Sequence, residues 1–163
     1  MNSILDPFLS RFDLATHLLV LLIAYILALP IAWDRERNER SAGLRTFPLV
    51  AIAACGFIQA AETVTSGSPE ATARIVEGLI NGVGFIGGGA ILVGRASIRG
   101  TATAASLWAT GAIGAAVGLG AYDIAIVLSA MTFFTLRFMT NFKTEGTGAI
   151  SEADGKRPPD VTP

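Results

Sequence analysis

The stretch that decides the fold is LATHLLVLLIAYILALPIAW, residues 14–33, which contains no charged side chain. A membrane-spanning helix needs about 17–25 consecutive, mostly apolar residues. A half-buried strand would instead alternate polar and apolar residues, and this block does not. The sequence therefore predicts a transmembrane helix from about Leu14 to Trp33. Asp13 is its expected amino-terminal cap, and Pro30 lies near the far end, where a membrane helix tolerates a kink.

Four further apolar blocks follow this one. They run from about Phe47 to Val64, from Pro69 to Val93, from Thr101 to Leu119 and from Ile124 to Met139. Ser68 and Pro69 form a typical helix start, with a capping hydroxyl followed by proline at the first helical position. Only 15% of the residues are charged, against about 25% in an ordinary soluble domain. We therefore expect an all-α polytopic membrane protein with five transmembrane helices.

The two ends of the chain differ from this membrane domain, which we expect over residues 1–142. Apolar side chains recur at helical spacing over residues 4–12, which is typical of a short interfacial helix, although a frayed terminus fits equally well. Residues 143–163 contain few large apolar side chains and predict a disordered cytoplasmic tail. A cleaved signal peptide is not expected, because Asp6, Arg11 and Asp13 precede the first block instead of a basic cluster.

The basic residues predict the orientation in the membrane. If the spans are right, Arg11 and Arg74 lie on one side, and the other ten basic residues lie on the opposite side. Basic residues in short loops favour the cytoplasm. We therefore expect an inner-membrane protein with its amino terminus outside and its carboxyl terminus in the cytoplasm. The ten are Arg35, Arg37, Arg40, Arg45, Arg95, Arg99, Arg137, Lys143, Lys156 and Arg157.

Glycines are concentrated in the third and fourth blocks. The pattern Gly82-x-Gly84-x-x-Gly87 has the letters of a dinucleotide-binding motif, but that motif requires a preceding strand, and here it lies inside an apolar block. Small residues four apart let membrane helices approach closely. We therefore expect a glycine-packed bundle centred on these two spans. The expected packing positions are Gly78, Gly82, Gly84, Gly88, Gly111, Gly114 and Gly118.

Three polar residues near the second and third blocks need an explanation. Glu77 and Asn81 lie one helical turn apart inside the third block, and Glu62 lies near the end of the second. An ionisable residue within a span is a candidate functional residue. Alternatively, Glu77 lies near the outer end and extends outward or pairs with Arg74. Spacing alone leaves both interpretations open.

The composition argues against several other function classes. The chain has a single histidine, His17, and a single cysteine, Cys55, so it offers no Ser/His/Asp or Cys/His set for nucleophilic catalysis. We expect no enzyme activity, no cofactor and no metal site. The net charge of −1 makes no case for nucleic acid binding. The expected partner is the lipid bilayer, with a second membrane protein or another copy of this chain left open.

The connection after the first block alternates acidic and basic residues from Asp34 to Arg40. One interpretation is a solvated, self-paired loop that only fixes topology, because surface ion pairs are individually weak. Acidic residues contribute little to topology, however, so their presence favours a structured face. We expect Asp34 and Glu36 to pair with Arg45 or Arg99 and to tie the first connection to the third. The candidate functional face comprises Asp34, Arg35, Glu36, Arg45, Arg99 and, behind them, Thr103.

Three stretches also carry a family resemblance. They are DRER (34–37) with SAGLRT (41–46), GVGFIGGGAIL (82–92), and IRG (98–100) with TAASLW (103–108). In order and spacing they resemble the MgtC/SapB family of bacterial inner-membrane proteins, over about residues 14–140. The chain departs from the family pattern at Asp34, where the family usually has Glu, and at Asn81 and Ala102.

The resemblance implies a five-span domain linked to growth under magnesium limitation and, in some pathogens, to survival inside host cells. It implies a regulatory or accessory protein more than a pump. The carboxyl-terminal soluble domain of longer members is not expected, because the tail is too short to bury a core. The alternative is a small oligomeric transporter or channel for a divalent cation. That alternative depends on Glu62, Glu77 and the inner acidic residues, since magnesium requires oxygen ligands.

Overall fold

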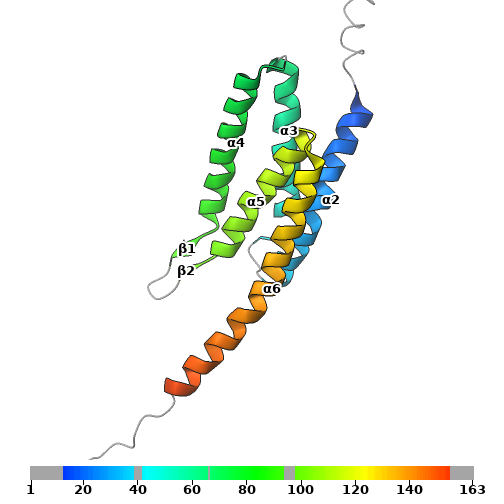
Figure 1. The fold of residues 1–163 in the computed structure, drawn as a ribbon. Coiled ribbons are helices and arrows are strands. Elements are labelled where there is room, and N and C mark those ends of the chain that lie inside the picture. The colour runs from blue at the N-terminus through cyan, green and yellow to red at the C-terminus, as the bar shows by residue number, and fades with distance from the viewer. Residues whose placement is uncertain (1–12, 39–41, 66, 94–97, 155–163) are drawn as a thin grey trace, which may run out of the picture.

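The computed structural model describes residues 13–38, 42–65, 67–93 and 98–154 (Figure 1). Five helices make up nearly all of this part of the chain, as the all-α prediction requires. They are α2 (Leu14–Asn38), α3 (Thr46–Thr65), α4 (Pro69–Gly89), α5 (Thr101–Gly118) and α6 (Tyr122–Asp154). Between α4 and α5 lies a two-stranded antiparallel hairpin, β1 (Leu92–Val93) and β2 (Ile98–Arg99), in which Leu92 pairs with Arg99.

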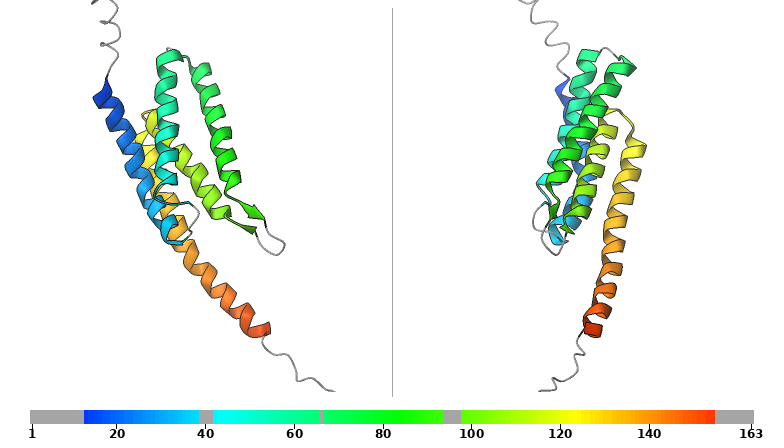
Figure 2. Two further views of the ribbon diagram at one scale, coloured as in Figure 1. Left: turned by 180° about the vertical axis from the view of Figure 1, so that it is seen from behind. Right: turned by 90° about the vertical axis from the view of Figure 1, so that its left-hand side faces the viewer.

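The helices form an antiparallel bundle with α5 at its centre. Helix α5 packs against α2, α3, α4 and α6, whereas α4 lies at the edge and packs against α3 and α5 (Figures 1 and 2). The carboxyl-terminal end of α2, the hairpin and the second half of α6 lie toward one end of the bundle, which we call the hairpin end. The α3–α4 turn and the α5–α6 turn lie toward the other. This arrangement places the regions rich in arginine together.

Both predicted helix starts are present. The Asp13 carboxylate accepts a hydrogen bond from the Thr16 backbone N–H at 3.2 Å, and hydrogen bonds from Thr16 hold the pKa of this carboxyl below its usual value. The Ser68 hydroxyl accepts from the Ala71 N–H at 3.3 Å, with Pro69 as the first residue of α4. Each cap satisfies an amide that the first helical turn leaves without a partner.

Three of the helices are long and apolar enough to cross a membrane: α2 over Leu14–Arg37, α3 over Thr46–Thr65, and α6 over Tyr122–Met139. The two remaining helices are less apolar for different reasons. Helix α4 carries the charged residues Glu70, Arg74 and Glu77. Helix α5 consists largely of Ala, Gly, Thr and Ser, which suits its central position because small side chains allow close helix packing.

Glycines on α5 allow this close packing. A Cβ added at Gly111 would lie 2.7 Å from Cγ1 of Val83 on α4, and one at Gly118 would lie 2.8 Å from Cβ of Ile58 on α3. At Gly114 it would overlap the carbonyl oxygen of Ala51 on α3. The backbones of α3 and α5 therefore approach so closely that a side chain at Gly114 has no room.

Four expected packing glycines on α4 do not meet a neighbouring helix. A Cβ added at Gly78, Gly82, Gly84 or Gly88 would have no atom of another element within 4 Å, so the prediction is wrong for these residues within one chain. Helix α4 instead contacts α5 through Val83 and Gly87, and a Cβ at Gly87 would lie 3.1 Å from the Ala104 carbonyl oxygen. Glycines occur on several faces of α4, and spacing does not reveal which face meets α5.

The boundaries of the helices differ from the prediction in three places. Helix α2 continues to Asn38, whereas the first span was expected to end at about Trp33. Helix α4 ends at Gly89, and the predicted end of the third span forms β1. Helix α6 continues to Asp154, so residues 143–154 are helical where a disordered tail was expected. Extending an existing helix adds one hydrogen bond per residue without a new nucleation cost. The expected interfacial helix at 4–12 and residues 155–163 lie outside the described part of the chain.

Candidate functional site

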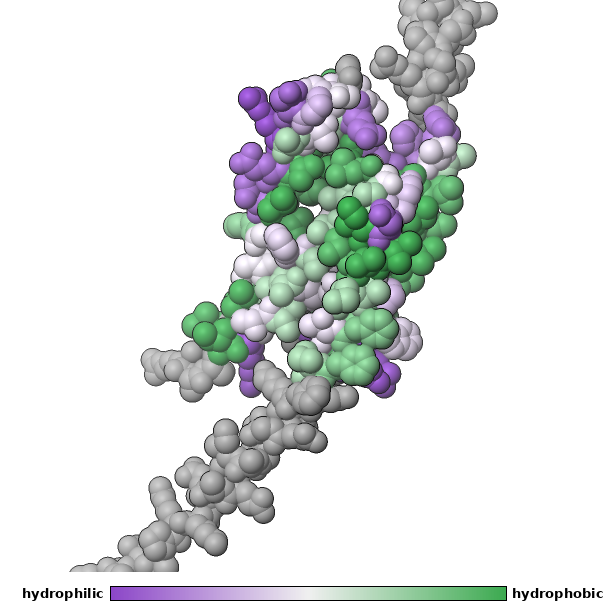
Figure 3. All heavy atoms as spheres, viewed as in Figure 1, coloured by the Kyte–Doolittle hydropathy of each residue, from purple (hydrophilic) through white to green (hydrophobic). Residues whose placement is uncertain are grey.

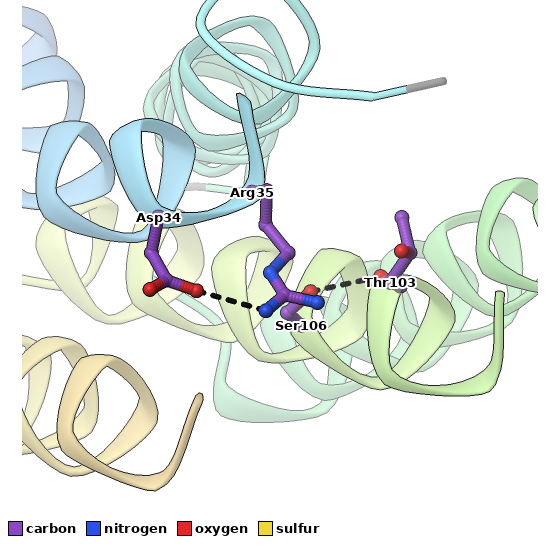
Figure 4. A network of polar contacts seen from close by, with 4 residues as sticks. All are labelled: Asp34, Arg35, Thr103 and Ser106. Atoms are coloured by element: carbon purple, nitrogen blue, oxygen red, sulfur yellow. Dashed lines mark hydrogen bonds and ion pairs between the residues drawn. The ribbon is translucent and has the colours of Figure 1, made fainter. Parts of the chain in front are cut away.

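Buried polar residues gather near the hairpin end, where α2 meets α5 (Figure 4). Asp34 and Arg35, adjacent on α2, are each only 3% exposed, and Arg35 Nη2 donates to Asp34 Oδ2 at 2.8 Å. On α5, Thr103 is fully buried and Ser106 is 2% exposed. We call these four residues the inner polar cluster.

The hydroxyls of the cluster are arranged along one side of α5. The Ser106 hydroxyl donates to the Thr103 carbonyl at 2.9 Å, and the Thr110 hydroxyl, one turn further, donates to the Ser106 carbonyl at 2.8 Å. The Arg35 side chain extends from α2 toward this side of α5 (Figure 4). The cluster is therefore a meeting point of a buried ion pair and a short row of buried hydroxyls.

The ion pair corrects the predicted pairing. Asp34 pairs with Arg35, its neighbour in the sequence, whereas Arg45 and Arg99 are exposed and form no ion pair with another described residue. Helix α2 continues to Asn38, so Asp34 and Arg35 lie on a helix that packs against α5 and not in a solvated connection. Since removal of a charge from water is costly unless it is paired, each side chain requires the other.

Glu36 also has a different partner from the one predicted. Its Oε2 accepts a hydrogen bond from the backbone N–H of Leu44 at 3.0 Å. Gly43 packs so closely against Glu36 that a Cβ at position 43 would overlap the carboxylate. Glu36 therefore ties the end of α2 to the residues immediately before α3, and not to the third connection.

The intramembrane candidates lie on the surface of the single chain. Glu62 on α3 and both Glu77 and Asn81 on α4 are exposed, and none forms an ion pair with another described residue. The structure therefore does not join Glu77 to Arg74. Within the described ranges, no three His, Cys, Asp or Glu side chains are grouped so that they could hold a metal ion.

The sequence reasoning missed three buried hydroxyls. Ser106 and Thr110 follow Thr103 at intervals of three and four residues, which is a helical spacing that could have indicated a polar side of α5. Ser129 is 5% exposed and donates to the Leu27 carbonyl at 2.6 Å, which joins α6 to α2. A single serine in an apolar block gives no comparable signal.

Comparisons with known proteins identify the relatives of this chain. The pattern of the MgtC family matches residues 21–145. Protein SrpB of Synechococcus elongatus is 38% identical over 135 residues, which cover 76% of this chain and 72% of SrpB. Protein MgtC of Salmonella typhimurium is 39% identical over 117 residues, which cover 72% of this chain and 49% of MgtC.

A further relative is the putative magnesium transporter YhiD of Escherichia coli. It is 35% identical over 130 residues, which cover 75% of this chain and 60% of YhiD. The chain thus spans about half the length of MgtC and a larger part of SrpB and YhiD. No solved structure matches. The family match and these relatives show that the chain is a membrane protein that belongs to the MgtC family.

Proposed function

We propose that this chain is a five-span inner-membrane protein that acts as a regulatory or accessory component in growth under magnesium limitation. Its amino terminus lies outside and its carboxyl terminus in the cytoplasm, so the hairpin end is the cytoplasmic end. Family membership and the similarity to YhiD, a putative magnesium transporter, support the proposed link to magnesium. The positive-inside rule supports the orientation.

The observation that supports the regulatory role is the buried ion pair of Asp34 with Arg35. Its carboxylate lies 2.8 Å from the guanidinium of Arg35, and both side chains are almost fully buried. A carboxylate that is already neutralised by a neighbouring cation is a poor ligand for a divalent metal. The pair instead allows two charged side chains to stay buried where the end of α2 packs against α5, and so supports a defined cytoplasmic surface.

Arg45, just before α3, and Arg99, on β2, are two exposed basic residues at the hairpin end. Arginine pairs with carboxylates through a planar fork that lysine cannot reproduce. We propose that they contact an acidic group of a protein partner in the membrane. Their exposure at the same end of the bundle as the buried ion pair supports this role.

Complementation tests the regulatory role. In a host that needs the protein for growth at low magnesium, the Arg45→Lys/Arg99→Lys variant should support at least tenfold fewer colonies than wild type, with normal membrane levels. Arg74→Lys, at the opposite end of the bundle, is the matched control and should grow as wild type. Full growth of the double variant would reject the proposed contact surface.

A divalent-cation transporter is the second candidate, and the buried hydroxyls of Thr103, Ser106 and Thr110 on α5 favour it. They form a row of oxygen atoms inside the bundle. Purified protein in liposomes that enclose a magnesium-sensitive dye separates the two candidates. The regulatory role predicts the same influx as protein-free liposomes. Influx that Asp34→Asn changes would favour the transporter.

A further inference from the structure

We propose that α4 is the interface between two copies of this chain and that it pairs with α4 of a second copy in a parallel arrangement. The proposal depends on α4 crossing the membrane, as the five-span topology requires. It does not depend on the link to magnesium. The proposed occupant of the exposed face of α4 is therefore a second copy of this chain.

The first observation is that α4 has too little burial and too much polarity for a peripheral membrane helix. Of its 21 residues, only Val83 and Gly87 are buried. A helix at the edge of a bundle faces lipid and should be strongly apolar, yet α4 is not among the three helices that are apolar enough to span. Hydrophilic surface covers the first part of α4, whereas α6 is mostly hydrophobic (Figure 3).

The second observation is that the charged residues of α4 and Asn81 share one face of the helix with two glycines. Six exposed residues recur at alternating intervals of four and three, which is the heptad spacing of a coiled-coil seam. All six lie within about 60° of Asn81 around the helix, at 100° per residue. We call them the α4 seam: Glu70, Arg74, Glu77, Asn81, Gly84 and Gly88.

The composition of the seam suits a second copy better than lipid. Asn81 lies twelve residues after the start of α4, about 18 Å along the helix and so near the middle of a bilayer. Its amide forms no hydrogen bond with another described residue. An asparagine within a seam can pair with its counterpart and so set the register and the number of helices.

Both ends of the α4 seam also favour a second copy of this chain. Gly84 and Gly88 have open space around their Cβ positions, so a second backbone can approach there. At the other end, Arg74 lies one seam position from both Glu70 and Glu77, so in a parallel pair it faces Arg74 of the other copy but can reach that copy's carboxylates in the layers above and below. Two copies with the same orientation in a membrane are related by a two-fold axis along its normal, which makes their α4 helices parallel.

Cysteine cross-linking of the full chain in membranes tests this interface, in a Cys55→Ala background. Asn81→Cys and Gly84→Cys should form disulfide-linked dimers on mild oxidation. Ile80→Cys is the matched control, because Ile80 is exposed at the same depth but points about 100° away from Asn81, outside the seam. Cross-linking at Ile80→Cys as efficient as at Asn81→Cys would overturn the proposed face.

Association in liposomes gives an independent readout. Asn81→Leu should weaken dimerisation about tenfold, as measured by energy transfer between labelled copies on dilution with lipid, because it removes the interhelical hydrogen bonds. Gly88→Leu should also weaken it by preventing close approach. Gly82→Leu is the control, since Gly82 is equally open but lies outside the seam. Unchanged association of Asn81→Leu and Gly88→Leu would overturn the proposal.

The five-span topology, on which the proposal depends, can be tested separately from the interface. If Asn81→Cys reacts with a membrane-impermeant maleimide in intact vesicles, α4 is not within the bilayer, and both the five-span topology and this interface are wrong. If Asn81→Cys is protected but does not cross-link, the topology stands and the interface alone is wrong.

Discussion

Asp34 and Arg35 are two adjacent charges buried among apolar helices. Burial of an ion pair contributes little net stability, because the loss of hydration offsets much of the attraction. Loss of one partner is different, since it leaves a buried charge without its neutralising neighbour. At the scale of the residue, each member of the pair therefore requires the other in order to stay buried where α2 meets α5.

A double-mutant cycle measures this requirement. Asp34→Leu and Arg35→Leu should each lower the free energy of unfolding by about 3–5 kcal/mol, and the double variant should lose less than the sum of the two. Unfolding in mixed detergent micelles, followed by circular dichroism, supplies the values.

Arg37→Leu is the control for this cycle, because Arg37 lies on the same helix but is exposed. It should change stability by no more than about 0.5 kcal/mol. Single variants at Asp34 and Arg35 that behave like this control would show that the ion pair is not required for the fold.

At the scale of the element, α4 and α5 are both rich in glycine but use it differently. Helix α5 is central, and its glycines let α3 and α4 approach closely. Helix α4 is peripheral, and several of its glycines have open space around them. Glycine is therefore necessary for packing on α5, whereas on α4 every glycine except Gly87 has open space around it within the chain.

Alanine substitution separates the two uses of glycine. Gly114→Ala should destabilise the bundle by about 1–3 kcal/mol, because the added methyl group overlaps the Ala51 carbonyl. Gly82→Ala should stabilise it by up to about 1 kcal/mol, since alanine is the better helix former and has space there. Melting temperatures in detergent show whether each variant is more or less stable than wild type. Equal effects of the two substitutions would contradict the packing of α5.

At the scale of the whole molecule, the arrangement of the bundle places the arginine-rich regions at the hairpin end. Lysine and arginine in short loops are retained in the cytoplasm. The hairpin end and the opposite end should therefore lie on different sides of the membrane, with α4 and α5 crossing it as well as the three strongly apolar helices.

Cysteine labelling in intact cells tests this topology in a Cys55→Ala background. Tyr122→Cys, at the start of α6, should react with a membrane-impermeant maleimide added from outside. Leu44→Cys, just before α3, should react only after the cells are opened. Both side chains are partly exposed, so access to each is decided by the membrane and not by packing. Labelling of Leu44→Cys in intact cells would reverse the orientation.

Much of the fold follows from the sequence because it depends on local properties. Apolar blocks of sufficient length, the Asp13 and Ser68 caps and the following Pro69 specify where helices begin, since a cap needs only residues within one turn. The described helix starts therefore agree closely with the prediction. The carboxyl-terminal end of α6 differs from the prediction. An existing helix can be extended one residue at a time without a new nucleation cost, so its end is difficult to predict from the sequence.

The partners of the charged residues depend on the tertiary structure. The sequence alone indicated that Asp34, Glu36 and Arg35 needed partners, because acidic residues do not serve topology. It could not show that Asp34 pairs with Arg35 or that Glu36 holds the Leu44 amide, since many arginines lie within reach of a flexible connection. The same limit applies to α4, where glycine spacing specified close approach but only the packing of α5 decided which face remains open for a partner.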